Sequence, residues 1–491
     1  MQLYDKDLLS VQEVRELVER AKAAQEELSQ KSQAEVDAIV KSIADAGVRN
    51  AKRLAKLAHE ETGFGIEADK VIKNVFASLD VYEHIKDMKT IGELGYDEEK
   101  KVRTIAVPVG VIAGLIPSTN PTSTAFYKSE ISIKAGNAIV FSPHPNARNC
   151  ILEAVKVIRQ AIAEAGGNEN LVSCITIPTI QATDNLMKHP DVALILATGG
   201  SAMVRAAYSS GTPAIGVGPG NGPAYIEKTA DLPLAVKRIM DSKTFDNGTI
   251  CASEQSVVCD KDMEVAVRTE MEKQGAYFLT DEQIAKLGKF ILRANGTMNP
   301  MIVGKSAQVI ADLAGIDIPA GTKVLVAKET GIGRGHPYSN EKLAPILAFY
   351  TADDYKGICK LAQDILHYEG AGHTFSMHTK DPEMVKYFAM RVPASRIIVN
   401  TPSALGGIGG TTGLMPALTL GCGAIGGSAT SENVGPMNLL NKRHVAEGLL
   451  ELDEIKAGLP TCTDGVCRGP KAEDVDIDAV VNEIVKRLRS M

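Results

Sequence analysis

The sequence predicts an α/β protein of two or three domains. Its 491 residues exceed the roughly 250–300 residues at which a single hydrophobic core stops growing. Three times in the first half of the chain, an apolar run rich in β-branched residues ends in a polar or glycine-rich turn and then enters a helical pattern. Repeated units of strand, loop and helix build parallel sheets, which bind ligands at the carboxyl ends of their strands.

Composition and charge favour an enzyme acting on small molecules. The net charge of −7 provides no basic surface for nucleic acid. No apolar run approaches the roughly 18 residues of a membrane span, and the first residues lack the pattern of a secretion signal. Eight cysteines, six of them scattered singly, form no disulfide framework. We therefore expect a cytoplasmic protein that binds neither nucleic acid nor membrane.

The first hundred residues predict helices followed by a hairpin. Across residues 10–57, apolar side chains recur at helical spacing among Ala, Glu and Lys, which predicts at least two amphipathic helices. A Gly-Tyr-Asp turn and an alternating apolar pattern then predict a β-hairpin at about residues 90–108. Neither segment carries an evident catalytic group.

The first unit of strand and loop ends at Asn120. The apolar residues 109–116 predict a buried strand, and the polar turn that follows leads into a predicted helix. Asn120 therefore lies where α/β proteins bind ligands. On spacing alone, an ordinary turn asparagine before a proline explains this residue equally well.

Two further units predict contacts with a cofactor. Residues 138–141 predict a strand, and the turn after it contains His144, a weak candidate for a general base because prolines flank it on both sides. Residues 192–197 predict a strand that passes through a glycine turn into a helix, whose first amides attract phosphate. Neither unit contains the Gly-x-Gly-x-x-Gly fingerprint of a standard dinucleotide fold. The two turns contain Ser142, Pro143 and His144, and Thr198, Gly199, Gly200 and Ser201.

Cys251 is the candidate nucleophile. It follows an Asn-Gly turn signal and precedes an apolar run ending at Val258, which places it on a loop just before a strand. A buried structural cysteine is the alternative, since free cysteine is among the residues most often packed inside proteins.

Residues 245–258, with the sequence FDNGTICASEQSVV, closely resemble the catalytic-cysteine segment of the CoA-acylating aldehyde dehydrogenases. The resemblance is strongest to the aldehyde half of bifunctional aldehyde-alcohol dehydrogenases and covers about residues 10–455. It implies the aldehyde dehydrogenase fold, with an NAD-binding domain, a catalytic domain and an oligomerisation arm that joins subunits of a homodimer or homotetramer. The corresponding ranges are residues 1–239, 240–427 and the hairpin at 90–108, with 428–456 returning to the oligomerisation and NAD-binding parts.

The same resemblance assigns roles to individual residues. Cys251 is the nucleophile, Asn120 stabilises the oxyanion, and Glu341 holds the nicotinamide ribose. Thr119, Ile250 and His373 line the substrate pocket, and no metal is expected. The remaining expected contacts with the cofactor are Ser142, Pro143, His144, Thr198, Gly199, Gly200, Ser201, Gly216 and Gly218.

One departure from the wider family indicates the acyl acceptor. Hydrolytic aldehyde dehydrogenases carry a glutamate in the segment matching residues 215–223, where it activates water. This chain has glycine at the matching position, which we assign to Gly216. Without that base, the acyl group on Cys251 is expected to transfer to a thiol instead of to water. The predicted reaction converts an aldehyde, CoA and NAD, with NADP as an alternative, to acyl-CoA and the reduced cofactor.

Several other functions compete with this prediction. A hydrolytic aldehyde dehydrogenase is disfavoured by Gly216, and a reductase of the glutamyl-phosphate type by the closer match of the cysteine segment. A non-catalytic scaffold is disfavoured by the joint presence of Cys251, Asn120 and Glu341. Acetaldehyde or propionaldehyde is the expected substrate, because the matched loops add no fixed cation. Sulfoacetaldehyde and succinate semialdehyde remain alternatives.

The C-terminal end differs in character from the rest of the chain. Residues 457–473 form a predicted linker, whose Cys462 and Cys467 are too isolated to define a metal site. Residues 474–491 predict a short helix with one apolar face. This tail resembles the encapsulation peptides that carry acylating aldehyde dehydrogenases into bacterial microcompartments, which implies a shell protein as partner. The alternative is a helix that packs on the enzyme itself.

Overall fold

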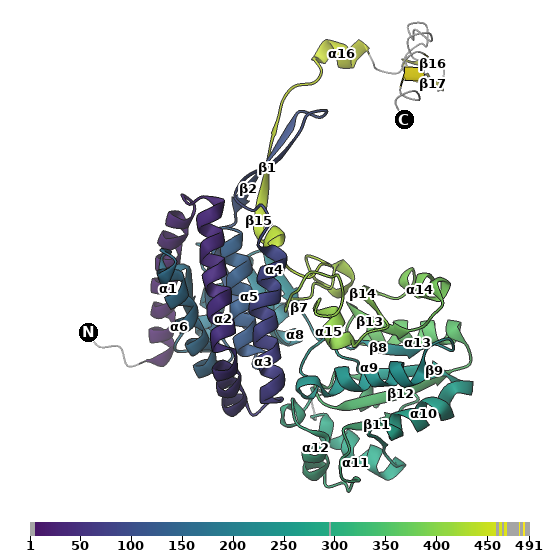
Figure 1. The fold of residues 1–491 in the computed structure, drawn as a ribbon. Helices are drawn as coiled ribbons and strands as arrows, with labels where there is room; N and C mark the ends of the chain where they lie inside the picture. The colour runs from purple at the N-terminus through teal and green to yellow at the C-terminus, as the bar shows by residue number, and fades with distance from the viewer. Residues whose placement is uncertain are drawn as a thin grey trace. The chain divides into compact units, whose positions relative to one another are not determined.

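The computed structural model describes residues 5–293, 296–457, 461–463, 466–468, 481 and 485–486. It consists of two compact units, Met1–Gly92 with Ala106–Asn441 and Glu93–Ile105 with Lys442–Met491. The first unit contains two parallel sheets, which confirm the predicted α/β fold (Figure 1). Among the described helices, none is long and apolar enough to cross a membrane.

The first sheet has five parallel strands in the order β5-β4-β3-β6-β7. The chain builds outward from β3 in one direction and then returns to add β6 on the other side of β3. The loops that follow β3 and β6 consequently leave the same edge side by side, at the switch point where such sheets bind ligands. The strands are β3 (Val111–Ile116), β4 (Ala138–Pro143), β5 (Val172–Cys174), β6 (Val192–Thr198) and β7 (Ala214–Val217).

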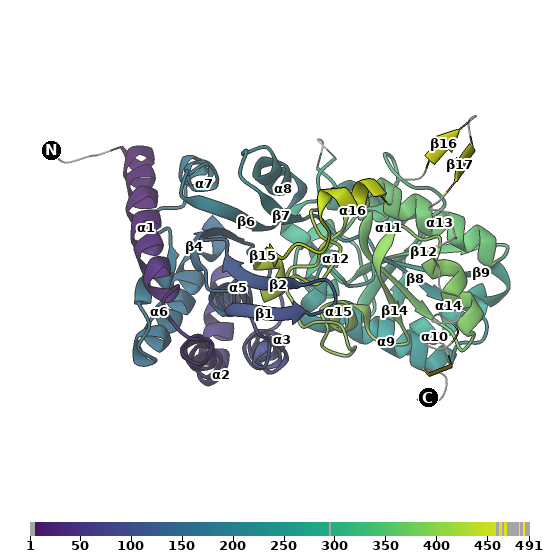
Figure 2. The same ribbon diagram turned by 90° about the horizontal axis from the view of Figure 1, so that it is seen from above.

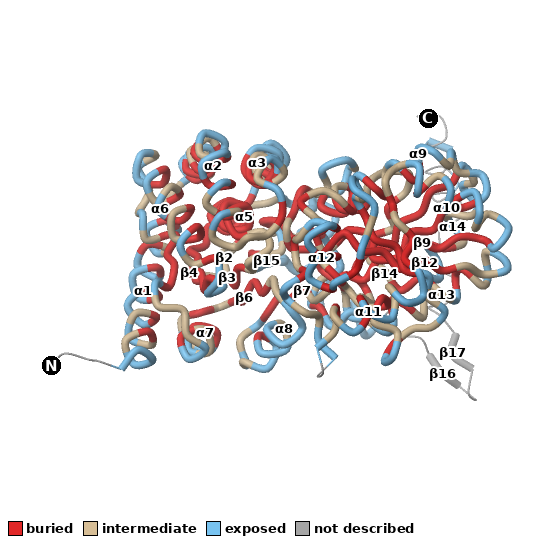
Figure 3. Tube along the Cα trace, turned by 90° about the horizontal axis from the view of Figure 1, so that it is seen from below, coloured by how far each residue is buried: buried red, intermediate tan, exposed pale blue. Residues whose placement is uncertain are grey.

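Helices cover both faces of this sheet. Figures 2 and 3 show α7 and α8 on one face and α5, with α2 and α3 outside it, on the other. Every residue of α5 is buried, because this helix is packed between the sheet and the outer helices. The predicted N-terminal helices are present. The helices of this part are α1 (Lys6–Leu28), α2 (Gln33–Thr62), α3 (Glu67–Val75), α4 (Val81–Ile85), α5 (Pro121–Lys134), α6 (Arg148–Glu164), α7 (Ile180–Met187) and α8 (Ser201–Tyr208).

The second sheet has seven parallel strands in the order β10-β11-β12-β9-β8-β13-β14. The predicted start of the catalytic domain at residue 240 is too late, because Pro223–Ile226 already pairs with β9 and β13 inside this sheet. The strands are β8 (Pro223–Ile226), β9 (Ser256–Asp260), β10 (Ala276–Phe278), β11 (Val324–Lys328), β12 (Ile346–Ala352), β13 (Gly372–His378) and β14 (Ala394–Val399).

Alternation along these strands forms two hydrophobic cores, one on each face. Val257 and Cys259 pack with residues of α9 and α10, whereas Val258 between them packs in the core that includes α11 to α14. Side chains of successive strand residues point to opposite faces, so β9 has apolar residues at consecutive positions from Val257 to Cys259. The helices are α9 (Leu232–Thr244), α10 (Glu264–Lys273), α11 (Asp281–Ile291), α12 (Ala307–Ala314), α13 (Tyr355–Tyr368), α14 (Pro382–Ala389) and α15 (Ser403–Gly407).

The second unit contains most of a three-stranded sheet in the order β1-β2-β15. Its strands are β1 (Gly92–Asp97), β2 (Val102–Pro108) and β15 (Leu440–Ala446), and α16 (Leu452–Ala457) follows. The predicted linker is not wholly irregular, because β16 (Thr461–Thr463) and β17 (Val466–Arg468) pair antiparallel within it. Nearly all of the predicted tail helix, residues 474–491, lies outside the described residues.

Candidate active site

Cys251 lies on the loop between α9 and β9, as predicted. The turn before it is unusual, because Asp246 and Asn247 have φ values of +46° and +53° and Gly248 one of +74°. Asparagine, aspartate and glycine tolerate this left-handed conformation best, and the two non-glycine residues each cost on the order of 1 kcal/mol there. Two hydrogen bonds hold the turn: the Asp246 amide donates to Asp69 Oδ2 at 2.7 Å, and Asn247 Nδ2 donates to the Gly304 carbonyl at 2.9 Å.

His373 is the nearest polar partner that the structure gives the Cys251 thiol. Its Nε2 lies 3.2 Å from Cys251 Sγ, and its Nδ1 lies 2.9 Å from Thr374 Oγ1. Both side chains come from the start of β13, which lies between β8 and the edge strand β14 in the second sheet. When Nδ1 carries the proton and donates to Thr374, Nε2 is the acceptor and can take the thiol proton.

The resting pair is uncharged. Burial, with a smaller contribution from the Glu341 charge, raises the pKa of Cys251 to about 12, and Arg396 acts in the opposite direction. Burial lowers the pKa of His373 to about 3. At neutral pH the site therefore holds a thiol beside a neutral imidazole. A resting thiolate is disfavoured, and we expect the thiolate to form as His373 accepts the proton during attack.

Arg396 is a buried cation near this pair. Its Nη2 donates to the carbonyls of His373 and Gly421 at 3.0 and 2.6 Å, and Nη1 lies 3.3 Å from Asn433 Oδ1. No carboxylate pairs with it among the described residues. Its positive charge favours the anionic form of the Cys251 sulfur.

Asn120 reaches the same place from the first sheet. It occupies the N-cap position of α5, directly after the loop that leaves β3, and its side chain makes no capping hydrogen bond to the helix. Its Nδ2 donates to Thr119 Oγ1 at 3.2 Å and to the Thr249 carbonyl at 3.4 Å, while its Oδ1 accepts from Lys73 Nζ at 2.6 Å. The two bonds made by Nδ2 are long, so a substrate oxygen can replace one of them.

A cavity of about 630 Å³ joins these groups. It extends from Cys251 along the carboxyl edge of the first sheet, as expected for a nucleotide bound at the switch point. Of the predicted residues, His373 touches the Cys251 sulfur without lining the cavity, and Ser201 begins α8 just behind the wall. The predicted residues in the wall are Thr119, Asn120, Ser142, Pro143, His144, Thr198, Gly199, Gly200, Gly218, Ile250, Cys251 and Glu341.

Gly216 does not belong to the cavity wall, which corrects the sequence prediction. A Cβ built at Gly216 would lie 2.8 Å from Val204 and 2.9 Å from Tyr208, two residues of α8. The wall is formed by the next residues, Val217, Gly218 and Pro219. A Cβ at Gly218 would meet nothing within 4 Å, so Gly218 is the position that could carry an activating carboxylate. The segment still lacks a base for water.

Two other predicted cofactor contacts, Glu341 and His144, each accept a hydrogen bond from a backbone amide. Glu341 is half-buried, its Oε1 accepts from the Gly220 amide at 2.8 Å, and desolvation followed by repulsion from Glu369 raises its pKa to about 8. His144 Nδ1 accepts from the Asn146 amide at 3.1 Å. That bond occupies one ring nitrogen in a local turn, which favours the cofactor role over the general base.

The sequence analysis did not identify part of the cavity wall or the buried cations that lie behind it. Nothing in the local pattern distinguishes the apolar wall residues from core residues, or the buried cations from surface ones. The missed residues include Leu343, Ile408, Leu418 and Leu420 in the wall, and Arg396, Lys70 and Lys73 behind it.

This geometry, a cysteine and an amide donor facing a nucleotide-sized cavity between two parallel sheets, defines an aldehyde dehydrogenase. The chain belongs to the aldehyde dehydrogenase family, whose model matches residues 3–339. It is 46% identical over 443 residues to the bifunctional aldehyde-alcohol dehydrogenase AdhE of Escherichia coli K12. That match covers 89% of this chain and 50% of the relative, so the chain spans about half the length of that protein.

Solved structures show the same fold. A probable aldehyde dehydrogenase from Listeria monocytogenes is 65% identical, with a TM-score of 0.91 over 92% of this chain and 100% of that one. An acetylating aldehyde dehydrogenase from Geobacillus thermoglucosidasius is 51% identical, with a TM-score of 0.90 over 92% and 99%. Two propionaldehyde dehydrogenases are 28% identical with TM-scores of 0.80, covering 88% of this chain and 97% of each. One comes from a Clostridium phytofermentans fucose utilisation microcompartment, and the other, from Rhodopseudomonas palustris, holds CoA and an acylated cysteine.

Proposed function

We propose that this protein oxidises a short aldehyde to acyl-CoA, with NAD as hydride acceptor and CoA as acyl acceptor. The observation that carries the proposal is the 3.2 Å contact between Cys251 Sγ and His373 Nε2, at the end of a cavity that Asn120 also enters. The names of the similar proteins, an acetylating aldehyde dehydrogenase and a propionaldehyde dehydrogenase with an acylated cysteine, support it.

Cys251 and His373 carry the covalent chemistry. The sulfur attacks the aldehyde carbon while its proton moves to His373 Nε2, and the carbonyl oxygen becomes an oxyanion. Asn120 Nδ2 and the Cys251 amide donate hydrogen bonds to that oxygen, and losing one such donor typically costs about 10²–10³ in rate. When the oxyanion collapses, hydride leaves the carbon and a thioester remains on Cys251. His373 then releases the first proton to solvent. The CoA thiol attacks the thioester carbon while its proton passes to His373 Nε2, and the C–S bond to Cys251 breaks as His373 returns that proton to the Cys251 sulfur.

The cavity wall is suited to hold NAD, which supplies the hydride-accepting nicotinamide when bound. Gly199 and Gly200 form the turn before α8, whose amides would hold the pyrophosphate, and His144 lies at the neighbouring loop. Glu341 has a carboxylate oxygen available for a ribose hydroxyl beyond its bond to Gly220. Nothing in these contacts favours NAD over NADP by charge, and NAD remains our expectation.

The wall also supports a small uncharged aldehyde. None of the described residues that line the cavity is Lys or Arg, so neither a sulfonate nor a carboxylate on the substrate finds a fixed cation there. Acetaldehyde and propionaldehyde are therefore favoured over sulfoacetaldehyde and succinate semialdehyde. The turn that includes Val217, Gly218 and Pro219 offers no carboxylate to activate water, which favours CoA as acceptor over hydrolysis.

The test is NADH formation from a panel of these four aldehydes, with and without CoA. We expect steady turnover with acetaldehyde or propionaldehyde only when CoA is present. Equal turnover without CoA would identify a hydrolytic enzyme, and no turnover with any aldehyde would favour a scaffold or a reductase of another substrate.

We further infer that the protein is a homo-oligomer in the cytoplasm, directed into a microcompartment by its tail. A microcompartment enzyme among the similar structures supports this. Strand β15 supports assembly, because its residues after Leu440 are exposed in the single chain and an exposed strand pairs readily. Light scattering on the purified protein tests the dimer or tetramer, and a single-chain mass would contradict it.

A further inference from the structure

A cluster of charged and polar side chains lies buried behind Asn120. It consists of Lys70, Lys73, Asp246 and Thr249 and is called the Lys73 cluster below. Lys70 and Lys73 both donate to Asp246 Oδ2, Lys70 at 3.0 Å, and Lys73 also donates to Thr249 Oγ1 at 2.8 Å. The side chains of Lys73 and Asp246 are 2% and 0% exposed. Burying such ions costs several kcal/mol each, so packing stability alone is a poor reason for the cluster.

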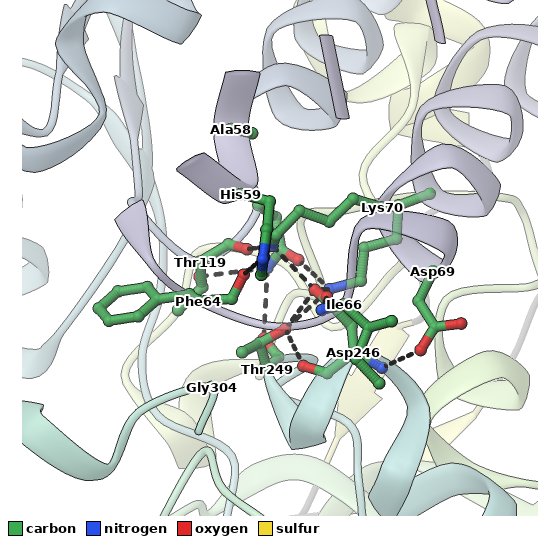
Figure 4. Close-up of polar contacts among 12 residues, drawn as sticks. Ala58, His59, Phe64, Ile66, Asp69, Lys70, Thr119, Asp246, Thr249 and Gly304 are labelled. Atoms are coloured by element: carbon green, nitrogen blue, oxygen red, sulfur yellow. Dashed lines mark hydrogen bonds and ion pairs between the residues drawn. The ribbon is translucent and has the colours of Figure 1, made fainter. Parts of the chain in front are cut away.

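The Lys73 cluster joins the two loops that carry the catalytic candidates. Asp246 belongs to the turn before Cys251, and Lys70 Nζ donates to the carbonyl of Thr119, the residue before Asn120, at 3.2 Å. Figure 4 shows Lys70 extending between Thr119 and Asp246, with Thr249 beside them. Asp246 is also held by the residue that precedes α3, because its Oδ1 accepts a hydrogen bond from the Ile66 amide at 2.7 Å.

Lys73 determines which way the Asn120 amide points. An ammonium group only donates hydrogen bonds, so the Asn120 atom 2.6 Å from Lys73 Nζ must be the oxygen. The Nδ2 group is consequently turned towards the Thr249 carbonyl and Thr119 Oγ1, with long bonds to both. A charge-assisted bond to Oδ1 also polarises the amide and strengthens Nδ2–H as a donor.

We propose that Lys73 is a positioning residue that orients and polarises Asn120, so that Asn120 Nδ2 meets the oxyanion formed when Cys251 attacks the aldehyde. This inference rests on the function proposed above. The competing role for Lys73 is purely structural, as one of two cations that neutralise Asp246. The two roles differ in one respect: only the positioning role acts through Asn120.

The decisive experiment is a double-mutant cycle of K73M and N120A, measured as CoA-dependent aldehyde oxidation. We expect K73M alone to lower kcat about 10- to 100-fold, below the roughly 10²–10³-fold of a lost oxyanion donor. The KM values for aldehyde and NAD should stay within about twofold, because Lys73 acts on the transition state. In the N120A background, K73M should change kcat by less than about twofold. Additive losses in the double variant would overturn the positioning role.

Two further variants address folding. K73M leaves Asp246 with a single cation, whereas K73M with D246N removes one charge of each sign and keeps the balance. We expect that variant to fold and to show at least the kcat loss of K73M. K134M is the matched control, because Lys134 is equally buried and is held by Asp37 at 2.5 Å and the Lys86 carbonyl at 2.8 Å, without any contact to Asn120.

The outcomes separate this inference from the proposed function. Native kcat in K73M/D246N, or a kcat loss in K134M as large as that in K73M, would overturn the positioning role alone. A wild-type protein that forms no NADH in the presence of CoA would contradict the proposed function first. The rate of Cys251 alkylation by iodoacetamide should be unchanged in K73M, and a large drop would show a disturbed site instead of a misdirected amide.

Discussion

The two sides of Cys251 use buried charge in opposite ways. On the side of the first sheet, Lys70 and Lys73 are both paired with the Asp246 carboxylate within a hydrogen-bonded cluster. On the side of the second sheet, Arg396 is bonded to carbonyls and has no carboxylate partner among the described residues. A hydrogen-bonded cluster of paired charges suits a fixed donor such as Asn120. An uncompensated cation suits a place where negative charge appears during the reaction, here the Cys251 sulfur.

The comparison of the two sides of Cys251 has a meaning only if Cys251 is the nucleophile. Cys251→Ala should lower kcat by on the order of 10⁴–10⁶, as for other covalent nucleophiles, while NAD still binds, because the cofactor is held by other residues. Steady-state NADH formation and NAD titration measure the two effects. Cys259→Ala is the matched control, a buried free cysteine in the neighbouring strand, and Cys150 and Cys422 should tolerate alanine similarly. A C251A enzyme with a large fraction of native activity would refute the mechanism.

Removing the base tests the second-sheet side. His373→Asn should lower kcat by about 10²–10⁴, the usual contribution of a general base. Imidazole added to the medium should restore part of the rate. Thr374→Val, which removes the partner of Nδ1, is expected to cost less than His373→Asn. Activity that is unaffected in His373→Asn would assign proton removal to another group.

Removing the donor tests the first-sheet side. Asn120→Ala should lower kcat by about 10²–10³ and leave Cys251 alkylation nearly unchanged, since Asn120 acts on the oxyanion and not on the thiol. Single-turnover measurement of NADH formation would locate the loss in the first chemical step. A loss confined to the KM for NAD would place Asn120 in cofactor binding instead.

The pH dependence of alkylation sharpens the contrast. Because burial raises the pKa of Cys251 to about 12, the reactive thiolate becomes more populated as pH increases. The alkylation rate of the free enzyme should climb about tenfold per unit between about pH 7 and 10, without a plateau. Arg396→Gln should slow alkylation at every pH, because it removes the cation that favours the thiolate. A plateau near neutral pH would show a preformed thiolate and imidazolium pair.

The smallest effect is expected at the C-terminus. Removing residues 458–491 should leave CoA-dependent activity within about twofold of native, because the cavity belongs wholly to the first unit. A fluorescent protein fused to residues 474–491 should enter shells in a host that makes them. Lost folding or activity on truncation, or a fusion that stays diffuse beside intact shells, would favour a helix that packs on the enzyme.

Local patterns predicted the catalytic loops but not their support. Cys251 and Asn120 follow recognisable strand and turn signals, and the structure brings them to one cavity. Gly216 was the wrong glycine because strand side chains alternate, so its Cβ would face α8 while the next residue, Val217, faces the cavity.

Lys73 and Arg396 could not be identified from the sequence. Lys73 lies on a helix with ordinary charged spacing, and Arg396 lies on a strand 145 positions after Cys251 in the sequence. Their burial depends on packing between elements far apart in the chain. The boundary between the two sheets was predicted less well. Strand β8, Pro223–Ile226, belongs to the second sheet, but no local sequence feature distinguishes it from β7 of the first sheet.

The most direct test of the acylating mechanism is the intact mass of the protein after mixing with propionaldehyde and NAD but no CoA. The mechanism predicts one propionyl group per chain, located on Cys251 by peptide mapping, together with a burst of about one NADH per site. Adding CoA should remove the group as propionyl-CoA and start steady turnover. Continuous NADH formation without CoA, with free propionate as product and no lasting adduct, would contradict the account.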